Sequence, residues 1–264
     1  MINTTVQLTE AEIQLFHEQG FLVLEAITTP DEVAQLREIY DRLFRGKVGW
    51  DEGNQFDLAG TDEGEVATLP QILGPSRYEP ALLNSLYLRN ARTIAQQLLG
   101  DEMLPNNGEH MIYKPPKVGA ATPWHQDQAY HDPNLQFQGV NFWLPLDNVT
   151  VESGCLQFVP GSHKLDVLPH HNINHDPRIH GLEVDEPEMW AAKAVPCPIP
   201  AGGATIHAAY MLHYAAANST NHPRRAYTLT FRLPPTQRAT PVDNYWMRNQ
   251  RTARAERAAQ ARQK

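Results

Sequence analysis

The chain of 264 residues has little cysteine, no long apolar run and no excess of basic residues. Its two cysteines, Cys155 and Cys197, are too few for a disulfide framework or a cysteine zinc cluster, so we expect both to be core thiols. No apolar run approaches the roughly 18 residues of a membrane span. The first residues also lack a basic start followed by an apolar segment. These absences predict a cytoplasmic protein with no membrane partner.

Charge excludes a second class of partner. The formal net charge is −8 at pH 7, which disfavours a nucleic-acid partner because phosphate binding needs a basic face. Only the segment 248–264 is strongly basic, with six Lys or Arg and a single Glu. This alanine-rich segment predicts a solvated surface helix, with an interaction tail as the alternative.

The first part of the chain has helical periodicity. Apolar spacing and capping residues predict helices that begin after Thr9 and Thr29, and a third that ends at Gly100. Residues 21–27, FLVLEAI, predict a strand between the first two helices. Residues 45–75 are rich in Gly, Asp and Glu without a steady period. They predict a long loop of the kind that forms lids in enzymes.

From about residue 103 to 234, short strand-like runs follow one another between Pro, Gly and Asn residues. The runs are HMIYKPP, WHQDQAY, QGVNFWLPLDNV, GCLQFVPGSH, AVPCPIP, GATIHAAYMLHY and RAYTLTFRLP, with residues 164–190 as a polar insertion. Short strands without intervening helices predict an antiparallel barrel or jelly roll. We therefore expect a mainly β fold with flanking helices in a single domain, 1–264. It would have a helical region (about 8–100), a double-stranded β-helix or cupin-like core (about 103–234) and a basic helical tail (about 248–264).

The run WHQDQAY contains a candidate metal pair. Residues two apart in a strand point to the same side, so His125 and Asp127 would converge, with Ala129 and His131 on the same face. One more histidine would complete the 2-His-1-carboxylate set of non-heme Fe(II) oxygenases. An isolated His-x-Asp is also common in turns and on surfaces. The candidates for the third ligand are His163, His170, His171, His175, His180, His207, His213 and His222.

Four ordered segments resemble the phytanoyl-CoA dioxygenase family of Fe(II)/2-oxoglutarate oxygenases. They are LTEAEIQLFHEQGFLVLEAI, WHQDQAY, NFWLPLDNVTVESGCLQFVPGSHK and IPAGGATIHAAYMLHYAAANSTNHPRRA, and the resemblance covers about residues 8–234. In this family a late His precedes an Arg by eleven residues, with an Asn at the fifth position. Asn218 and Arg224 stand at those distances from His213. The resemblance therefore implies Fe(II), 2-oxoglutarate and O₂ as cofactors, with His125, Asp127 and His213 as metal ligands.

The resemblance also implies roles for other residues. Arg224 would bind the far carboxylate of 2-oxoglutarate, because a guanidinium fits a carboxylate bidentately, whereas Arg225 should point the opposite way. Trp143 and His110 are further candidates for 2-oxoglutarate binding, with a plain core Trp and a structural His as the alternatives. The candidates for the substrate pocket are His131, Lys114 and His207.

The chain departs from the family at one position. Many members have Gly-Ser after the late His, where the Ser hydroxyl helps to hold the far carboxylate. This chain has Tyr214 and Ala215 instead. The loss of one neutral hydrogen bond costs about 1 kcal/mol, and Thr228 or Thr230 on the following strand could replace the donor.

The resemblance implies an enzyme that hydroxylates, desaturates or cyclises an unactivated C–H of a small molecule, with release of succinate and CO₂. Asp127 fills the position that related halogenases leave free for chloride. The acidic loop 51–65 and the His-rich segment 170–180 are candidate lids. Their polarity favours a small, polar or cationic metabolite, such as a sugar or an amino-acid-derived natural product, over a fatty chain. The alternatives are a cupin-like metal-binding isomerase or binding protein and an inactive interaction module. Arg224 counts against both, and the sequence leaves the oligomeric state open.

Overall fold

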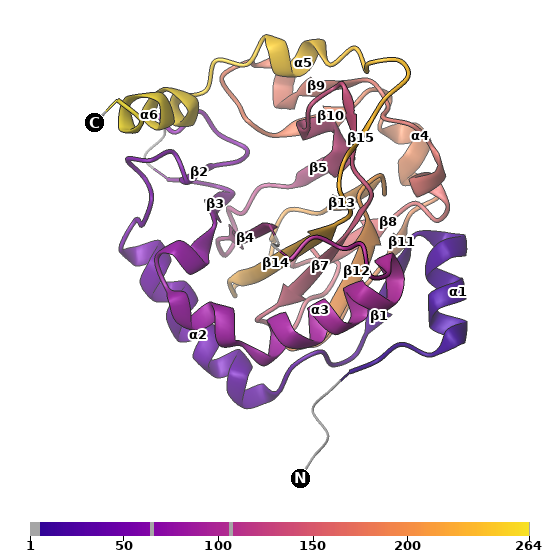
Figure 1. Ribbon diagram of the computed structural model, residues 1–264. Coiled ribbons are helices and arrows are strands. Elements are labelled where there is room, and N and C mark those ends of the chain that lie inside the picture. Colours follow the sequence, from indigo (N-terminus) through magenta and orange to yellow (C-terminus); the bar gives the residue numbers. More distant parts are fainter. Residues whose placement is uncertain (1–5, 64–65, 106–107, 264) are drawn as a thin grey trace.

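Two antiparallel sheets form a jelly-roll core, as predicted, in the computed structural model, which describes residues 6–63, 66–105 and 108–263 (Figure 1). The larger sheet has the order β1-β12-β7-β14-β4-β3-β2 and the smaller one the order β11-β8-β13-β5. The larger sheet comprises β1 (Phe21–Leu24), β2 (Gln55–Asp57), β3 (Pro70–Leu73), β4 (Gly108–Lys114), β7 (Gly139–Pro145), β12 (Ala204–Ala208) and β14 (Arg224–Arg232). The smaller sheet comprises β5 (Thr122–His125), β8 (Leu156–Phe158), β11 (Val195–Pro196) and β13 (His213–Ala215).

Two short strand pairs and the helices complete the fold. The pairs are β6 (Leu135–Gln136) with β15 (Thr236–Gln237), and β9 (His170–Asn172) with β10 (Leu182–Val184). The α-helices are α1 (Glu10–Gln19), α2 (Pro30–Arg45), α3 (Leu86–Leu99), α4 (Glu188–Ala191), α5 (Tyr245–Arg248) and α6 (Ala253–Ala261). The 3₁₀ turns are η1 (Pro75–Arg77), η2 (Pro80–Asn84), η3 (Asp127–Tyr130), η4 (Ser162–Lys164) and η5 (Ile173–His175). No helix of the described residues combines the length and the apolar character that a membrane crossing requires.

The first helices begin and end where the sequence predicts. Thr9 and Glu12 form a reciprocal capping box at the start of α1, which satisfies two backbone N–H groups that the helix leaves free. Gly20 ends α1 at φ 88°, a left-handed conformation that suits glycine. Helix α3 covers the outer face of the larger sheet, where the Tyr87 hydroxyl donates to the carbonyls of Phe142 (3.0 Å) and Tyr227 (3.1 Å).

The prediction of a loop over residues 45–75 is wrong in part, because β2 and β3 lie in this range and extend the larger sheet. Local polar contacts hold this segment. The Asp57 carboxylate accepts hydrogen bonds from the backbone N–H groups of Ala59, Thr68 and Leu69. Such contacts leave no hydrophobic period in the sequence, which explains why the strands were not predicted.

The inner face of the larger sheet carries the polar side chains that matter for function. Paired residues of neighbouring antiparallel strands share a face. One row across β12, β7, β14 and β4 consists of Thr205, Trp143, Thr228 and His110. The next row consists of His207, Asn141, Thr230 and Gly108. The apolar residues between the two sheets include Phe21, Trp143, Leu156, Phe158 and Ala215, and both Cys155 and Cys197 are free and buried, as predicted.

Candidate metal centre

Three predicted ligands lie together between the two sheets. His125 ends β5 and His213 begins β13, and the two residues are direct partners in the smaller sheet. Their Nε2 atoms lie 3.6 Å and 3.8 Å from Asp127 Oδ1. One ligand atom of each residue falls within 4.8 Å of the others. This arrangement can hold a divalent metal ion through two imidazoles and one carboxylate.

Backbone contacts fix the orientation of both rings. His125 Nδ1 lies 2.7 Å from the Pro123 carbonyl and His213 Nδ1 lies 2.9 Å from the Met211 carbonyl. A carbonyl only accepts, so each Nδ1 carries the proton and donates it. Each Nε2 is therefore left as the free lone pair on the side of Asp127, which is the tautomer that a metal ligand needs.

The prediction of one strand through His131 is wrong. Strand β5 ends at His125, and residues 127–130 form the 3₁₀ turn η3. The buried Gln126 side chain accepts from Leu168 N–H (2.8 Å) and donates to the Tyr210 carbonyl (2.9 Å), which draws the chain out of the sheet. Asp127 is thus placed by a turn, and His131, just after that turn, is exposed.

Asn141 holds the carboxylate of Asp127 and was not predicted. Its amide donates to Asp127 Oδ2 at 2.5 Å, and Thr230 Oγ1 donates to Asn141 Oδ1 at 2.5 Å. His207 Nε2 lies 3.4 Å from the same Asp127 oxygen, so this predicted pocket residue contacts a candidate ligand. Asn141 stands two residues before Trp143, on the same strand face, and this spacing could have indicated it from the sequence.

The surroundings favour the ionised form of Asp127. Burial raises the pKa of the Asp127 carboxyl, but His213, His125 and His207 together hold that pKa well below its usual range. Burial, with His125 adding to it, lowers the pKa of His213. An ionised Asp127 carboxylate beside a neutral His213 imidazole suits the binding of a metal cation.

Arg224 lies on the inner face of β14, six residues before Thr230. It is 2% exposed, and its Nε has no hydrogen-bond partner among the described residues. Its Nη1 donates to the Ile112 carbonyl at 3.4 Å, and Cζ lies 5.4 Å from the centre of the Trp143 ring. Burial lowers its pKa to about 10, so the guanidinium stays charged at neutral pH. A buried cation with so few partners fits an anion that occupies the space beside it.

Three other groups on this face fit the same space, two of them buried hydroxyls and the third the half-buried His110. The hydroxyls of Thr228 and Thr205 are buried without a hydrogen-bond partner among the described residues. His110 is opposite Thr228 on β4, and burial lowers its pKa to about 4, which keeps it neutral. The Thr230 hydroxyl is already engaged with Asn141. Of the two threonines predicted to replace the family serine, Thr228 is therefore the one with a free hydroxyl.

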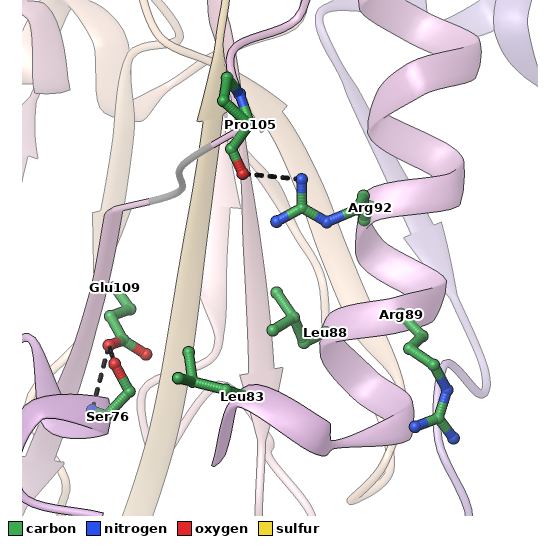
Figure 2. A pocket seen from close by; sticks show the side chains of 7 residues that line it. All are labelled: Ser76, Leu83, Leu88, Arg89, Arg92, Pro105 and Glu109. Atoms are coloured by element: carbon green, nitrogen blue, oxygen red, sulfur yellow. Dashed lines mark hydrogen bonds between the residues drawn. The ribbon is translucent and has the colours of Figure 1, made fainter. Parts of the chain in front are cut away.

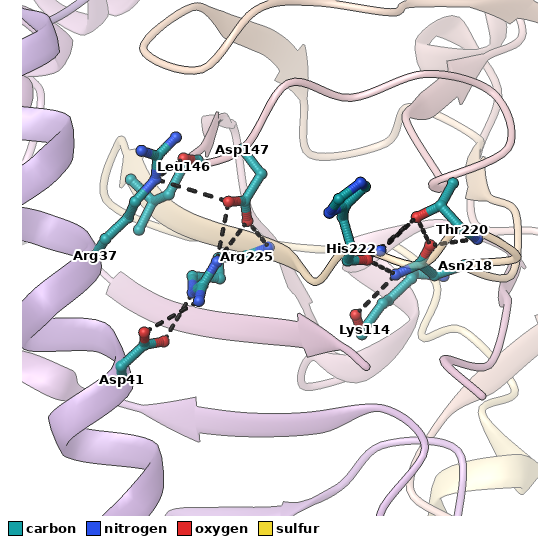
Figure 3. A network of polar contacts seen from close by, with 9 residues as sticks. All are labelled: Arg37, Asp41, Lys114, Leu146, Asp147, Asn218, Thr220, His222 and Arg225. Carbon is teal, nitrogen blue, oxygen red and sulfur yellow. Dashed lines mark hydrogen bonds and ion pairs between the residues drawn. The ribbon is translucent and has the colours of Figure 1, made fainter. Parts of the chain in front are cut away.

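Lys114 is not placed to line a substrate pocket, contrary to the prediction. It is completely buried, and its ammonium donates to the carbonyls of Ala120 (2.6 Å), Ala215 (3.0 Å) and Ala216 (2.8 Å). These three bonds use all its donors. The Asn218 amide donates in turn to the Lys114 carbonyl (3.1 Å) and to the His222 carbonyl (2.8 Å), as Figure 3 shows. Lys114 and Asn218 thus fix the backbone within the segment from His213 to Arg224.

Arg225 points away from Arg224, as predicted. Its guanidinium pairs with Asp41 of α2 (2.7 Å) and with Asp147 (2.9 Å) on the outer side of the sheet (Figure 3). Asp147 also lies 3.7 Å from Arg37 Nε of α2. Arg225 is therefore a structural residue that attaches α2 to the sheet.

The basic C-terminal segment is docked on the protein, and the prediction of a solvated tail is wrong for the arginines that face inward. Helices α5 and α6 lie beside the insertion and the β2 region (Figure 1). Trp246 is 3% exposed and donates to the Ala129 carbonyl of η3 at 3.0 Å. Arg254 donates to the Gly53 carbonyl (3.0 Å), and Arg257 pairs with Asp62 (2.8 Å). The segment thus ties the turn that carries Asp127 to the loop before β2.

One surface pocket lies away from these residues. It has a volume of about 420 Å³ and is lined by residues of α3 and its neighbours, including Leu88, Arg89, Arg92 and Glu109 (Figure 2). Glu109 is on the opposite face of β4 from His110. The pocket therefore opens on the outer side of the larger sheet and contains none of the predicted site residues.

Comparison with known proteins agrees with this geometry. The family model described as "Phytanoyl-CoA dioxygenase (PhyH)" matches residues 16–226. The solved structure of EvdO2 from Micromonospora carbonacea var. aurantiaca, complexed with 2-oxoglutarate, is 38% identical with a TM-score of 0.78, over 92% of this chain and 98% of that one. The phytanoyl-CoA dioxygenase domain-containing protein 1 of Danio rerio is 26% identical, over 84% of this chain and 89% of its own length. The carbocyclase SnoK of nogalamycin biosynthesis has the same fold, with 23% identity and a TM-score of 0.69, over 91% of this chain and 90% of that one.

Proposed function

The chain belongs to the phytanoyl-CoA dioxygenase family and is an Fe/2-oxoglutarate-dependent dioxygenase, and on that premise we propose that it oxidises an unactivated C–H of a small metabolite. The buried Arg224 on the face that also carries the Asp127 contacts supports this proposal most strongly. An isomerase or a simple metal-binding protein would have no use for a buried cation at this place. The products would be an alcohol, a desaturated compound or a ring, with succinate and CO₂.

Each residue of the centre has a defined task in this proposal. Bound Fe(II), with 2-oxoglutarate and O₂, supplies the oxidising power for hydrogen removal. His125, Asp127 and His213 hold the metal ion, and Asn141 keeps the Asp127 carboxylate in one orientation through Asp127 Oδ2. Lys114 and Asn218 keep His213 and Arg224 in register.

The far carboxylate of 2-oxoglutarate would be bound by Arg224 and Thr228. Arg224 offers its unpaired Nε, and Thr228 offers a buried hydroxyl four residues along the same strand face. Ala215 replaces the family serine and is buried without a donor. Thr228 therefore restores the neutral hydrogen bond, worth about 1 kcal/mol, that this replacement removes. Trp143 packs beside the guanidinium, and His110 lies next to Thr228 on the neighbouring strand β4.

SnoK, which shares this fold, acts in nogalamycin biosynthesis. We extend that setting to this chain and propose a natural-product or sugar-like intermediate as its substrate. His131, which is exposed just after η3, would contact this substrate, whereas His207 is engaged with Asp127.

An anaerobic titration tests the proposal. Protein loaded with Fe(II) is expected to develop a weak visible charge-transfer band on addition of 2-oxoglutarate, because the keto acid binds the metal. Iron binding without such a band at any 2-oxoglutarate concentration would favour a metal-binding isomerase instead.

Trp246→Phe is expected to weaken iron binding by about tenfold, the lower end of the effect of residues that support metal ligands. Phenylalanine keeps an aromatic ring in the pocket but cannot donate to the Ala129 carbonyl, so the turn with Asp127 loses one of its ties. Iron affinity is measured by titration, with the melting temperature as a check on folding. Tyr245→Phe is the control, since Tyr245 is the neighbouring aromatic residue in α5 and is 39% exposed. Equal iron affinity in both variants would refute the role of the C-terminal segment.

A further inference from the structure

Arg232 lies on the inner face of β14, at the opposite end of the strand from Arg224. Both are on β14 with the same parity, and Arg232 pairs with Gly139 while Thr230 pairs with Asn141. Thr230 and Asn141 lead directly to the Asp127 carboxylate. Two residues along a strand span about 7 Å, so Arg232 is one row beyond the metal centre. Arg224 lies three rows from Thr230 in the other direction along β14.

The guanidinium of Arg232 is held over an aromatic ring and is otherwise free. Its Cζ lies 5.2 Å from the centre of the Phe137 ring, and that ring lies 4.7 Å from the ring of His131. Within residues 6–63, 66–105 and 108–263, no carboxylate pairs with Arg232 and its side chain makes no hydrogen bond. Arg238, six residues on, is by contrast paired with Asp166. Arg232 is exposed at the end of β14 and thus presents unused N–H donors there.

His131 connects Arg232 to the metal centre. Partial desolvation of its ring lowers its pKa, the Asp127 charge opposes this, and the Arg232 charge lowers it further. Both charges act on one ring because His131 follows the turn that carries Asp127 and stacks on Phe137. A neutral imidazole adds a second polar group that can donate to an oxyanion beside the guanidinium.

We infer that Arg232, supported by Phe137 and His131, binds an oxyanion of the substrate, a carboxylate or a phosphate ester, on the side of the metal centre away from 2-oxoglutarate. The inference rests on the proposed function. Stacking on a ring restricts the guanidinium and favours bidentate contact with an oxyanion. One arginine then binds the cosubstrate and the other the substrate, with the metal between them. The C–H to be oxidised would lie about one row from the anionic group, and a cationic metabolite would be repelled.

Nuclear relaxation in the Mn(II)-loaded full chain, saturated with 2-oxoglutarate, tests this site. The probes are glucose 6-phosphate, glucuronate and methyl glucoside, which share a ring and differ in charge. Proton relaxation of the two anionic sugars is expected to increase at lower concentration than that of methyl glucoside. Arg232→Ala should lower the affinity for the anionic probes about tenfold, because one charge-assisted contact is lost. Arg232→Lys should restore part of this affinity. The anionic sugar that binds more tightly shows whether the substrate group is a phosphate (glucose 6-phosphate) or a carboxylate (glucuronate).

The control variant is Arg89→Ala, which removes one positive charge from α3 on the outer side of the sheet. It should leave probe binding unchanged. Equal binding of charged and neutral sugars, or equal binding in Arg232→Ala and wild type, overturns the inference. The charge-transfer band separates this failure from that of the proposed function. Both the wild type and Arg232→Ala should show the band, and its absence from wild type would instead refute the oxygenase assignment.

Discussion

Asp127→Ala is expected to lower iron affinity by at least about 100-fold and to abolish 2-oxoglutarate turnover. Residues that only support a metal ligand change affinity by about 10–100-fold, and Asp127 supplies the one carboxylate of the set itself. The variant would leave two neutral imidazoles and a buried Asn141 amide without its acceptor. Iron content after equilibration with excess Fe(II), and succinate formation, measure the two effects.

Two controls separate ligand loss from general damage. Asp132→Ala removes an exposed carboxylate five residues on, which only caps Asn134, and should bind iron as the wild type does. His207→Ala removes a neighbour of Asp127 Oδ2 and should retain iron, because both Nε2 ligands and the carboxylate remain. If His207→Ala alone lost the metal, the late ligand would be His207 and not His213.

The alternation of side chains along a strand predicted the directions of two neighbouring residues of β14. It placed Arg224 and Arg225 on opposite sides, and the ion pairs of Arg225 with Asp41 and Asp147 bear this out. Parity succeeds there because the residues of β14 pair in continuous register with β4 and β7. In such a ladder the side-chain period of two is fixed by the backbone hydrogen bonds.

Parity failed after His125, where long-range contacts determine the backbone. The Gln126 side chain bonds to Leu168 and Tyr210, which are 42 and 84 residues away in the chain. The docking of the C-terminal arginines escaped prediction for the same reason, since the partner of Arg254 at Gly53 is 201 residues away. A single sequence shows that these residues are polar or basic. It does not show with which distant carbonyl or carboxylate they will form a hydrogen bond or an ion pair.

Arg224→Leu is expected to weaken 2-oxoglutarate binding by at least about 30-fold, whereas Arg225→Leu should leave it nearly unchanged. Removal of one partner from a buried charge pair costs about 2–5 kcal/mol, and about 1.4 kcal/mol corresponds to a tenfold change. Arg225 faces the outer side and pairs with Asp41 and Asp147. Titration of the anaerobic charge-transfer band measures both affinities. The reverse order of effects would show that the register of β14 is shifted by one residue.

The same two substitutions should differ in their effect on the free energy of unfolding of the protein without 2-oxoglutarate. Arg224 is a buried cation whose Nε lacks a partner among the described residues, so replacement by an apolar side chain should leave the free energy of unfolding equal or raise it by about 1 kcal/mol. Arg225→Leu breaks ion pairs between α2 and the sheet and should lower it by about 2 kcal/mol. Added 2-oxoglutarate stabilises a protein that binds it by mass action, so the wild type and Arg225→Leu should gain melting temperature while Arg224→Leu should not. A clear loss of stability in Arg224→Leu without 2-oxoglutarate would mean that the guanidinium serves the fold and is not reserved for a dicarboxylate.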